Sequence, residues 1–190
     1  MAKFNHYVNT VGFDFLREIC QREGMRRSFD KGDFFLRFGE SPRYWGFIES
    51  GYFKYSVIDS DGDEHITGFT FSGNLAGDYY STLHHAPALN DMIAGSSATV
   101  LVVSAEKIRS LLDAHPDIRL SMAESLFRMA HERYVDLYRH SPKQRYLELI
   151  HRCPALLQHI TLKEFASYLN ITPTHLSRIR REILLEGGGK

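Results

Sequence analysis

The sequence predicts an α+β protein: an antiparallel β-roll, then a long helix, then an all-α domain that contains a helix-turn-helix. Two observations predict this class. Between Lys31 and Ser104, short runs of aromatic and β-branched residues alternate with turn residues about every 8–12 residues. From Glu106 onward the apolar residues recur with a helical period instead. We therefore place the roll at residues 1–115, a dimerisation helix at 116–140 and the helix-turn-helix domain at 141–190.

The composition indicates a soluble globular protein. Of the 190 residues, 43% are hydrophobic and 13% aromatic, which is enough for a core and excludes a disordered chain. No apolar run is long enough to span a membrane, and the N-terminus lacks the apolar stretch of a secretory signal. Cys20 and Cys153 lie far apart, so we expect no disulfide framework and a cytoplasmic protein.

Charge is distributed unevenly along the chain. The net charge is zero, but residues 139–190 contain nine Lys or Arg and only four Asp or Glu, a net charge of +5. The remainder of the chain therefore carries a net charge of −5. This asymmetry favours an anionic partner at the C-terminal end. Chance clustering on a solvated surface is the alternative, and charge alone does not decide between them.

The individual elements follow from local signals. The apolar spacing of Gly12 to Arg22 predicts a short amphipathic helix. Asp61-Gly62 is typical of a tight hairpin. The expected strands are Phe34–Leu36, Tyr44–Glu49, Tyr52–Ile58, Glu64–Phe71 and Thr99–Ser104. The expected later helices are Glu106–Ala114, Asp117–His140, Lys143–Arg152, Thr161–Leu169 and Thr172–Leu185. Thr161 and Glu164 form a capping-box pattern at the start of one of these helices.

The long helix carries two apolar faces. One face follows the alternating three- and four-residue spacing of a heptad seam, formed by Leu120, Ala123, Phe127, Ala130, Tyr134 and Leu137. A second face beside it contains Ile118, Met122, Leu126 and Met129. We expect one face to pack on the roll and the seam to form a homodimer interface. Burial of both faces within a single chain is the alternative.

The segment Leu162–Arg181 has the pattern of a helix-turn-helix. Its apolar residues have the spacing needed where two short helices cross, and Asn170 stands in the turn, where a left-handed residue is required. An ordinary helical hairpin shares this spacing, but it does not explain a second helix rich in hydroxyl, histidine and arginine side chains. Such side chains suit phosphates and base edges in the major groove. The expected DNA-binding residues are Thr172, Thr174, His175, Ser177, Arg178, Arg180 and Arg181.

With these elements in place, nearly the whole chain resembles the Crp/Fnr family of bacterial transcription regulators. The members of this family have the same order of roll, long helix and helix-turn-helix. The turn motifs of the roll are also similar to theirs: Gly32-Asp33, Gly39-Glu40, Phe47–Gly51, Asp61–Glu64 and Gly73–Asp78. The run Leu169–Arg180 resembles the branch common in Bacteroidetes-type bacteria. The resemblance implies a cyclic-nucleotide-binding-like sensor domain joined to a DNA-binding domain.

The sequence departs from the pattern of the members that bind cyclic AMP. Those members place Gly-Glu at the start of a short helix, followed by an Arg that pairs with the cyclic phosphate. Here Gly77-Asp78 stands at the first position, and no Lys or Arg occurs between Lys54 and Lys107. We therefore expect no binding of cyclic AMP. A pocket for another effector would be lined by Asp78, Tyr79, Tyr80 and Ser81, and aromatic filling of the roll interior is the alternative.

The sequence lacks the motifs of iron–sulfur, metal and catalytic sites. Two distant cysteines cannot ligate an iron–sulfur cluster, and adjacent histidines such as His84 and His85 point to opposite faces of a strand. We therefore expect no metal, no cofactor and no catalytic residues, and a cupin-like metalloenzyme is disfavoured. The main alternative to a transcription regulator is a β-roll module that binds a small molecule or protein without binding DNA. The expected partners are double-stranded DNA, a second copy of the chain, an unidentified small-molecule effector and RNA polymerase, with no membrane.

Overall fold

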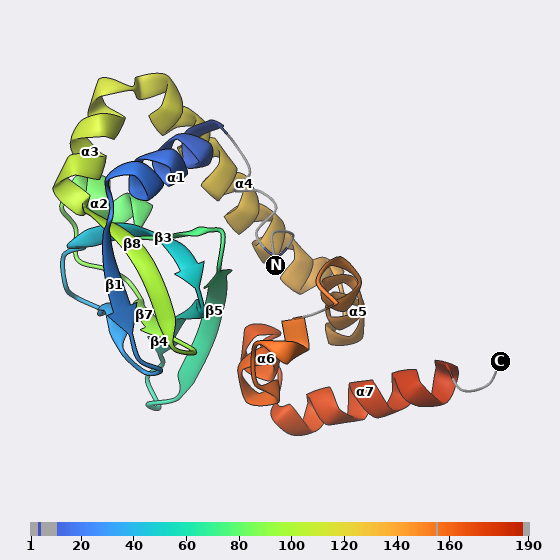
Figure 1. The fold of residues 1–190 in the computed structure, drawn as a ribbon. Coiled ribbons are helices and arrows are strands. Elements are labelled where there is room, and N and C mark those ends of the chain that lie inside the picture. The colour runs from blue at the N-terminus through green and yellow to red at the C-terminus, as the bar shows by residue number, and fades with distance from the viewer. Residues whose placement is uncertain (1–3, 5–10, 155, 188–190) are drawn as a thin grey trace.

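The expected α+β class is confirmed by the computed structural model, which describes Phe4, residues 11–154 and residues 156–187. Figure 1 shows the strands gathered in one body, with α4 running from the top of that body down its side to the C-terminal helices. The helices are α1 (Val11–Glu23), α2 (Tyr79–His84), α3 (Ala105–Ala114), α4 (Pro116–Arg139), α5 (Pro142–Arg152), α6 (Leu162–Tyr168) and α7 (Pro173–Gly187), with a short 3₁₀ turn at Leu156–Gln158. None of the helices among these residues is long and apolar enough to cross a membrane.

The roll consists of two four-stranded sheets in which every pair of neighbouring strands is antiparallel. Their orders are β1-β8-β3-β6 and β2-β7-β4-β5. The strands are β1 (Met25–Phe29), β2 (Phe34–Leu36), β3 (Tyr44–Ser50), β4 (Tyr52–Ile58), β5 (Glu64–Phe71), β6 (Leu75–Ala76), β7 (Asp91–Ala94) and β8 (Ala98–Ser104). The hairpin expected at Asp61-Gly62 joins β4 to β5, and Gly62 adopts a positive φ of 88° there.

Besides the 3₁₀ turn at Leu156–Gln158, four elements were not predicted, namely β1, β6, β7 and α2. All four are short, and β1 exposes every residue except Phe29, so its sequence shows no buried–exposed alternation. It exists because it pairs with β8 at the edge of its sheet, a contact between residues far apart in the chain. The five expected strands and six expected helices all form, with ends that differ by at most two residues.

The apolar faces of α1, α3 and α4 cover one end of the roll. Met122 of α4 is completely buried in a cluster with Leu16 of α1, Trp45 of β3 and Leu112 of α3. Ile118 and Leu126 pack against the same cluster. The second apolar face of the long helix therefore packs on the end of the roll and its covering helices, as expected.

The C-terminal helices share a core with two strands of the roll. Ile66, Phe69 and Phe71 of β5 are buried together with Phe165 and the other core residues of α6 and α7. Figure 1 shows α6 beside the lower end of β5. This packing fixes the position of α6 and α7 relative to the roll.

Candidate functional site

The turn between α6 and α7 has the geometry that the sequence predicts. The Thr161 side chain accepts a hydrogen bond from the Glu164 backbone N–H, and the Glu164 carboxylate accepts one from the Thr161 N–H, which completes a capping box at the start of α6. At the end of α6, Asn170 adopts a left-handed conformation with φ of 55°. Leu176 and Ile179 of α7 are then buried against Phe165 of α6. The two helices cross through their apolar faces and leave the opposite face of α7 in solvent.

The exposed face of α7 carries most of the predicted DNA-binding residues. Thr174, His175, Arg178 and Arg181 are exposed. Thr174, Arg178 and Arg181 are spaced by four and three residues, so they lie along one face of the helix, opposite Leu176 and Ile179. Within the described residues, no hydrogen bond or ion pair engages the side chains of these arginines. Their charges are available to a partner outside the chain.

The other predicted DNA-binding residues have partly structural positions. The Thr172 hydroxyl accepts a hydrogen bond of 3.2 Å from the His175 N–H and so caps α7. The Ser177 hydroxyl donates to the Pro173 carbonyl at 3.0 Å, although its oxygen can still accept a bond. Arg180 is half-buried on the flank of α7.

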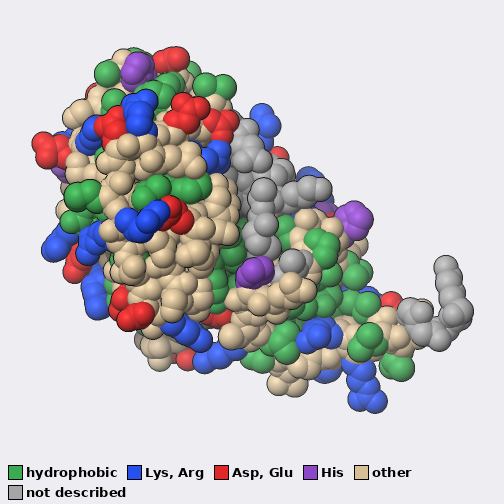
Figure 2. Space-filling view, viewed as in Figure 1, with side chains coloured by type: hydrophobic (Ala, Val, Ile, Leu, Met, Phe, Trp, Pro, Cys, Tyr) green, Lys and Arg blue, Asp and Glu red, His purple; other side chains and the backbone are tan. Residues whose placement is uncertain are grey.

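Acidic residues are held away from this exposed face. Lys143 of α5 lies 2.7 Å from a Glu186 carboxylate oxygen and 4.0 Å from one of Glu182. These contacts turn the acidic side chains of α7 toward α5. Figure 2 shows Lys and Arg side chains projecting from the lower edge of the molecule, in the region of α6 and α7.

The heptad seam of α4 is an exposed apolar ridge. Phe127 is 71% exposed, and Leu120, Ala130, Tyr134 and Leu137 are also exposed, whereas Ala123 is half-buried. Nothing within the described chain covers the ridge. Tyr138 was not among the predicted interface residues, yet it is 76% exposed and packs edge-on against Tyr134 at 5.2 Å between ring centroids. The signal was present, because Tyr138 follows Tyr134 by four residues and extends the same face.

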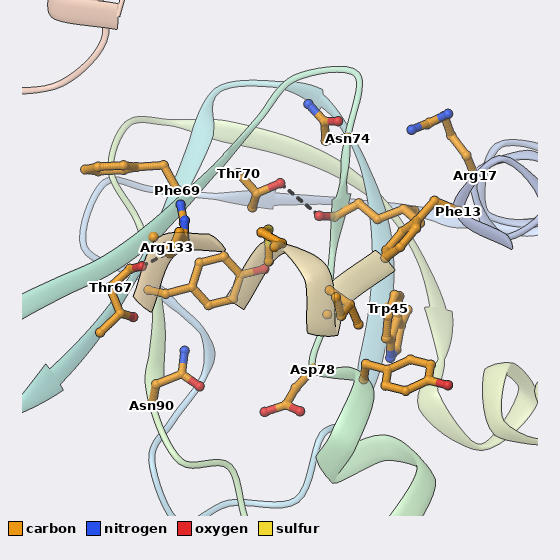
Figure 3. Close-up of a pocket in the computed structure, with 17 residues that line it drawn as sticks. Phe13, Arg17, Trp45, Thr67, Phe69, Thr70, Asn74, Asp78, Asn90 and Arg133 are labelled. Atoms are coloured by element: carbon orange, nitrogen blue, oxygen red, sulfur yellow. Dashed lines mark hydrogen bonds between the residues drawn. The ribbon is translucent and has the colours of Figure 1, made fainter. Parts of the chain in front are cut away.

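A cavity of about 370 Å³ lies between the roll and α4. Its walls are mainly aromatic and aliphatic, and they come from the roll, α1 and α4 (Figure 3). The apolar lining residues are Phe13, Trp45, Tyr55, Phe69, Leu75, Tyr79, Leu126 and Met129. A cavity of this size is at the lower end of the range that holds small organic ligands.

Two of the four predicted pocket residues line this cavity and two do not. Asp78 and Tyr79 line it. Tyr80 is instead 59% exposed, and Ser81 is buried with its hydroxyl donating to the Pro87 carbonyl at 3.3 Å. The physical reason is that Asp78 caps α2, a helix that was not predicted. Successive residues of that helix point in directions about 100° apart, so they cannot all face one cavity.

Two cations at this cavity were not predicted. Arg17 reaches it from α1 and Arg133 from α4, both outside the Lys54–Lys107 stretch that lacks Lys and Arg. In Figure 3, Arg133 and Arg17 lie on opposite sides of the view, with Asp78 below. Arg17 is ion-paired with Asp14. No local sequence signal marks Arg133, because only the packing of α4 across the roll brings it there.

Burial raises the pKa of two tyrosines at this cavity. Burial, followed by repulsion from the Asp78 carboxylate, raises the pKa of Tyr55 far above its ordinary value. Burial likewise raises the pKa of Tyr79, whose hydroxyl donates to the Arg119 carbonyl at 2.6 Å. The Asp78 side chain accepts a hydrogen bond of 2.9 Å from the Ser81 N–H and so occupies the N-terminus of α2. No cluster of three or more His, Cys, Asp or Glu that could hold a metal occurs among the described residues.

Comparisons with known proteins agree with this architecture. Residues 26–115 match the cyclic nucleotide-binding domain family. The fold is similar to FixK2 from Bradyrhizobium japonicum, with 18% identity and a TM-score of 0.72 over 86% of each chain. It is also similar to the c-di-GMP-responsive global regulator CLP of Xanthomonas campestris, with 15% identity and a TM-score of 0.65 over 91% of each chain.

A third similar structure is the catabolite activator protein of Thermus thermophilus, with 18% identity and a TM-score of 0.55 over 95% of this chain and 87% of that one. The sequence itself matches none of the curated proteins. At these identities the structural matches establish the fold. Residues 26–115 therefore match the cyclic nucleotide-binding domain family by sequence, and the chain has an α+β fold like that of the Crp/Fnr-family regulators.

Proposed function

We propose that the protein is a homodimeric, sequence-specific DNA-binding transcription regulator of the cytoplasm. The single observation that carries this proposal is the exposed face of α7. A helix that follows a left-handed turn at Asn170 presents Thr174, His175, Arg178 and Arg181 to solvent, with no acidic partner for the arginines among the described residues. Hydroxyl, imidazole and guanidinium groups on one helix face suit the edges of bases and the phosphates that flank a major groove.

The ridge on α4 supports a homodimer. Helix-turn-helix proteins bind two half-sites about one helical turn apart, which requires two recognition helices related by symmetry. An exposed row of apolar side chains with heptad spacing is the surface that a second copy would bury. The division into a sensor-like roll, a dimerisation helix and a DNA-binding domain follows from these roles.

Genomic footprinting of the tagged protein tests the proposal directly. The expected result is protection of sites with two inverted half-sites. A protein with α7 truncated before Pro173 provides the matched control, because it keeps the roll and α4 but lacks the proposed recognition helix. Identical enrichment by both proteins, or no protected site for the full chain, would favour a β-roll module that does not bind DNA.

Arg180→Gln should weaken binding to every DNA sequence by the same factor. Arg180 lies on the flank of α7, where a guanidinium can reach phosphate and not base edges. Loss of one phosphate contact should reduce the slope of log affinity against log salt by about one unit. The measurement is a fluorescence-anisotropy titration at several salt concentrations, with Glu182→Gln as a control that changes charge on the side facing α5. A changed sequence preference with an unchanged slope would contradict the phosphate role.

Cyclic AMP should not bind with micromolar affinity. Asp78 already occupies the N-terminus of α2, and its carboxylate repels a phosphate placed there. Arg133 lies at a different wall of the cavity, so its charge does not replace the missing cation beside α2. Calorimetry of the full chain should show no saturable heat, and a micromolar dissociation constant would refute this expectation. The proposed effector of the cavity is therefore a different small molecule.

A further inference from the structure

A second groove lies between α2, the start of α3 and the segment that leads into β3. Its volume is about 510 Å³, and it shares no lining residue with the cavity between the roll and α4. Figure 1 shows α2 and α3 together at one end of the molecule, far from α6 and α7. The groove is therefore separate both from that cavity and from the proposed recognition helix.

Two arginines line this groove. The backbone carbonyl of Arg43 accepts a hydrogen bond of 2.9 Å from the Ala105 N–H, which places Arg43 beside the start of α3. The Arg43 guanidinium makes no hydrogen bond or ion pair with any described residue. Arg109 of α3 donates one to Nδ1 of His85 at 3.3 Å. Glu106 is the only carboxylate among the described lining residues, so the groove keeps a net positive charge.

The contact with Arg109 determines which nitrogen of His85 carries the proton. A guanidinium can only donate, so Nδ1 of His85 accepts and the ring proton lies on Nε2. His85 ends α2 in a left-handed conformation with φ of 51°, which is uncommon for a residue other than glycine. Its side chain is exposed, so the Nε2–H can donate to a ligand in the groove.

A buried hydroxyl at this groove has no acceptor for its proton. Thr82 is 3% exposed, and its Oγ1 accepts a hydrogen bond of 2.9 Å from Nε1 of Trp45. No acceptor for the hydroxyl proton of Thr82 occurs in the part of the chain that the structure describes. Because a buried donor without an acceptor is unfavourable, this hydroxyl favours a ligand that presents an oxygen to the groove.

The donors of the groove suit a phosphate group. Guanidinium, imidazole N–H and hydroxyl groups can all donate to its oxygens, and the N-terminus of α3 adds a partial positive charge. The volume of the groove lies within the range of small-molecule sites, so it also accommodates an organic body. Ser41 and Ser104 supply exposed hydroxyls, whereas the apolar side chains among the described lining residues are only Pro42 and Ala105. A hydroxylated body fits this lining better than an aromatic one.

We propose that the groove binds a small sugar phosphate, with the phosphate held by Arg43 and Arg109. Thr82 donates its hydroxyl proton to an oxygen of the phosphate, and the sugar hydroxyls bond to Ser41 and Ser104. The site is independent of DNA binding, because none of its residues belongs to α7 or to the helices that pack beside it.

Trp45 supplies a reporter, because it is the only tryptophan of the chain and its indole N–H is bonded to Thr82. Its single indole N–H signal in an NMR spectrum should shift on titration with glucose 6-phosphate at constant ionic strength. The expected dissociation constant is about 1 mM. Glucose should bind at least about tenfold more weakly, because it lacks the charged group. Inorganic phosphate should bind about fivefold more weakly, because it cannot reach the serine hydroxyls as well.

Each arm of this titration has an outcome that contradicts the site. No saturation by about 20 mM glucose 6-phosphate, well above the expected constant, would overturn the groove as a binding site. Equal affinity for glucose and glucose 6-phosphate would overturn the role of the phosphate. Equal affinity for inorganic phosphate and glucose 6-phosphate would overturn the role of the sugar.

Variants with opposite changes of charge locate the ligand. Arg43→Gln and Arg109→Gln should each weaken binding of glucose 6-phosphate about tenfold. Glu106→Gln should strengthen binding about threefold, because it removes a carboxylate that repels the phosphate. Arg43 and Glu106 are exposed, so we expect their replacement to leave the fold intact. Unchanged affinity in both arginine variants would overturn the proposed phosphate contacts.

Arg133→Gln is the matched control. Trp45 also lines the cavity between the roll and α4, and Arg133 is a cation of that cavity. This variant should bind glucose 6-phosphate with the affinity of the wild type. Loss of binding by Arg133→Gln, with full binding by Arg43→Gln, would place the ligand in that cavity and overturn the groove. Since no titration contains DNA, its outcome does not depend on the result of footprinting.

Discussion

Phe127→Asp should convert the protein from a dimer to a monomer. Phe127 stands in the middle of the exposed ridge on α4 and is 71% exposed, so the monomer tolerates an aspartate there at little cost in stability. In a dimer the same carboxylate would be buried in an apolar contact without a partner, and the dimer dissociation constant should rise by about a hundredfold or more. Sedimentation velocity over a range of protein concentrations measures this shift.

Arg128→Asp is the control for the dimer experiment. It introduces the same carboxylate one residue later, about 100° round the helix from the ridge, at another exposed position. We expect this variant to remain a dimer, and far-UV circular dichroism should show the same helix content for both variants, because neither position is buried within the chain. A wild-type protein that sediments as a monomer at tens of micromolar (roughly the range in which weak dimers associate) would refute the dimer hypothesis.

Arg178→Ala should lose both affinity and base preference on the operator of the protein. Arg178 lies on the exposed face of α7, one turn after Thr174, and its guanidinium has no partner among the described residues. A bidentate contact from arginine to guanine contributes about 1–3 kcal/mol, so the affinity should fall by about 5- to 150-fold. The loss should be confined to one base pair in each half-site, where the variant accepts all four bases.

Two comparisons separate this role from a general charge effect. Arg178→Lys keeps the positive charge but loses the planar fork, so it should recover affinity for all sequences without recovering the base preference. Arg128→Ala removes an arginine that lies on α4, far along the chain from α7, and should leave DNA affinity unchanged. If Arg178→Ala retained wild-type affinity and preference, α7 would not be the recognition helix.

Much of the fold was predictable because its signals are local. The capping box at Thr161, the left-handed turn at Asn170 and the hairpin at Gly62 each depend on a few neighbouring residues. The period of apolar residues in α4 likewise reports which of its faces is buried, and Met122 is buried as the pattern indicates. Such signals act over a few residues, so they do not depend on how the elements pack against one another.

The cavity could be predicted only in part. Asp78 and Tyr79 lie at it, but Tyr80 and Ser81 turn away because a short unpredicted helix begins at Tyr79. That helix has six residues, too few for a recognisable apolar period. Its position depends on Trp45, whose ring nitrogen donates to Thr82 at 2.9 Å from a strand far along the chain.

The amino-acid sequence determined the α+β class, the order of the elements, the exposed ridge of α4 and the polar face of α7. Each follows from periodicity and capping over a few turns of chain. Only the tertiary structure decided that Arg133 of α4 meets Thr67 of β5 and Tyr168 of α6. These three residues are separated by dozens of positions, and packing brings them together because α4 crosses the side of the roll on which α6 also rests. Local patterns specify the elements of this protein, whereas the contact of α4 with both β5 and α6 depends on how those elements pack.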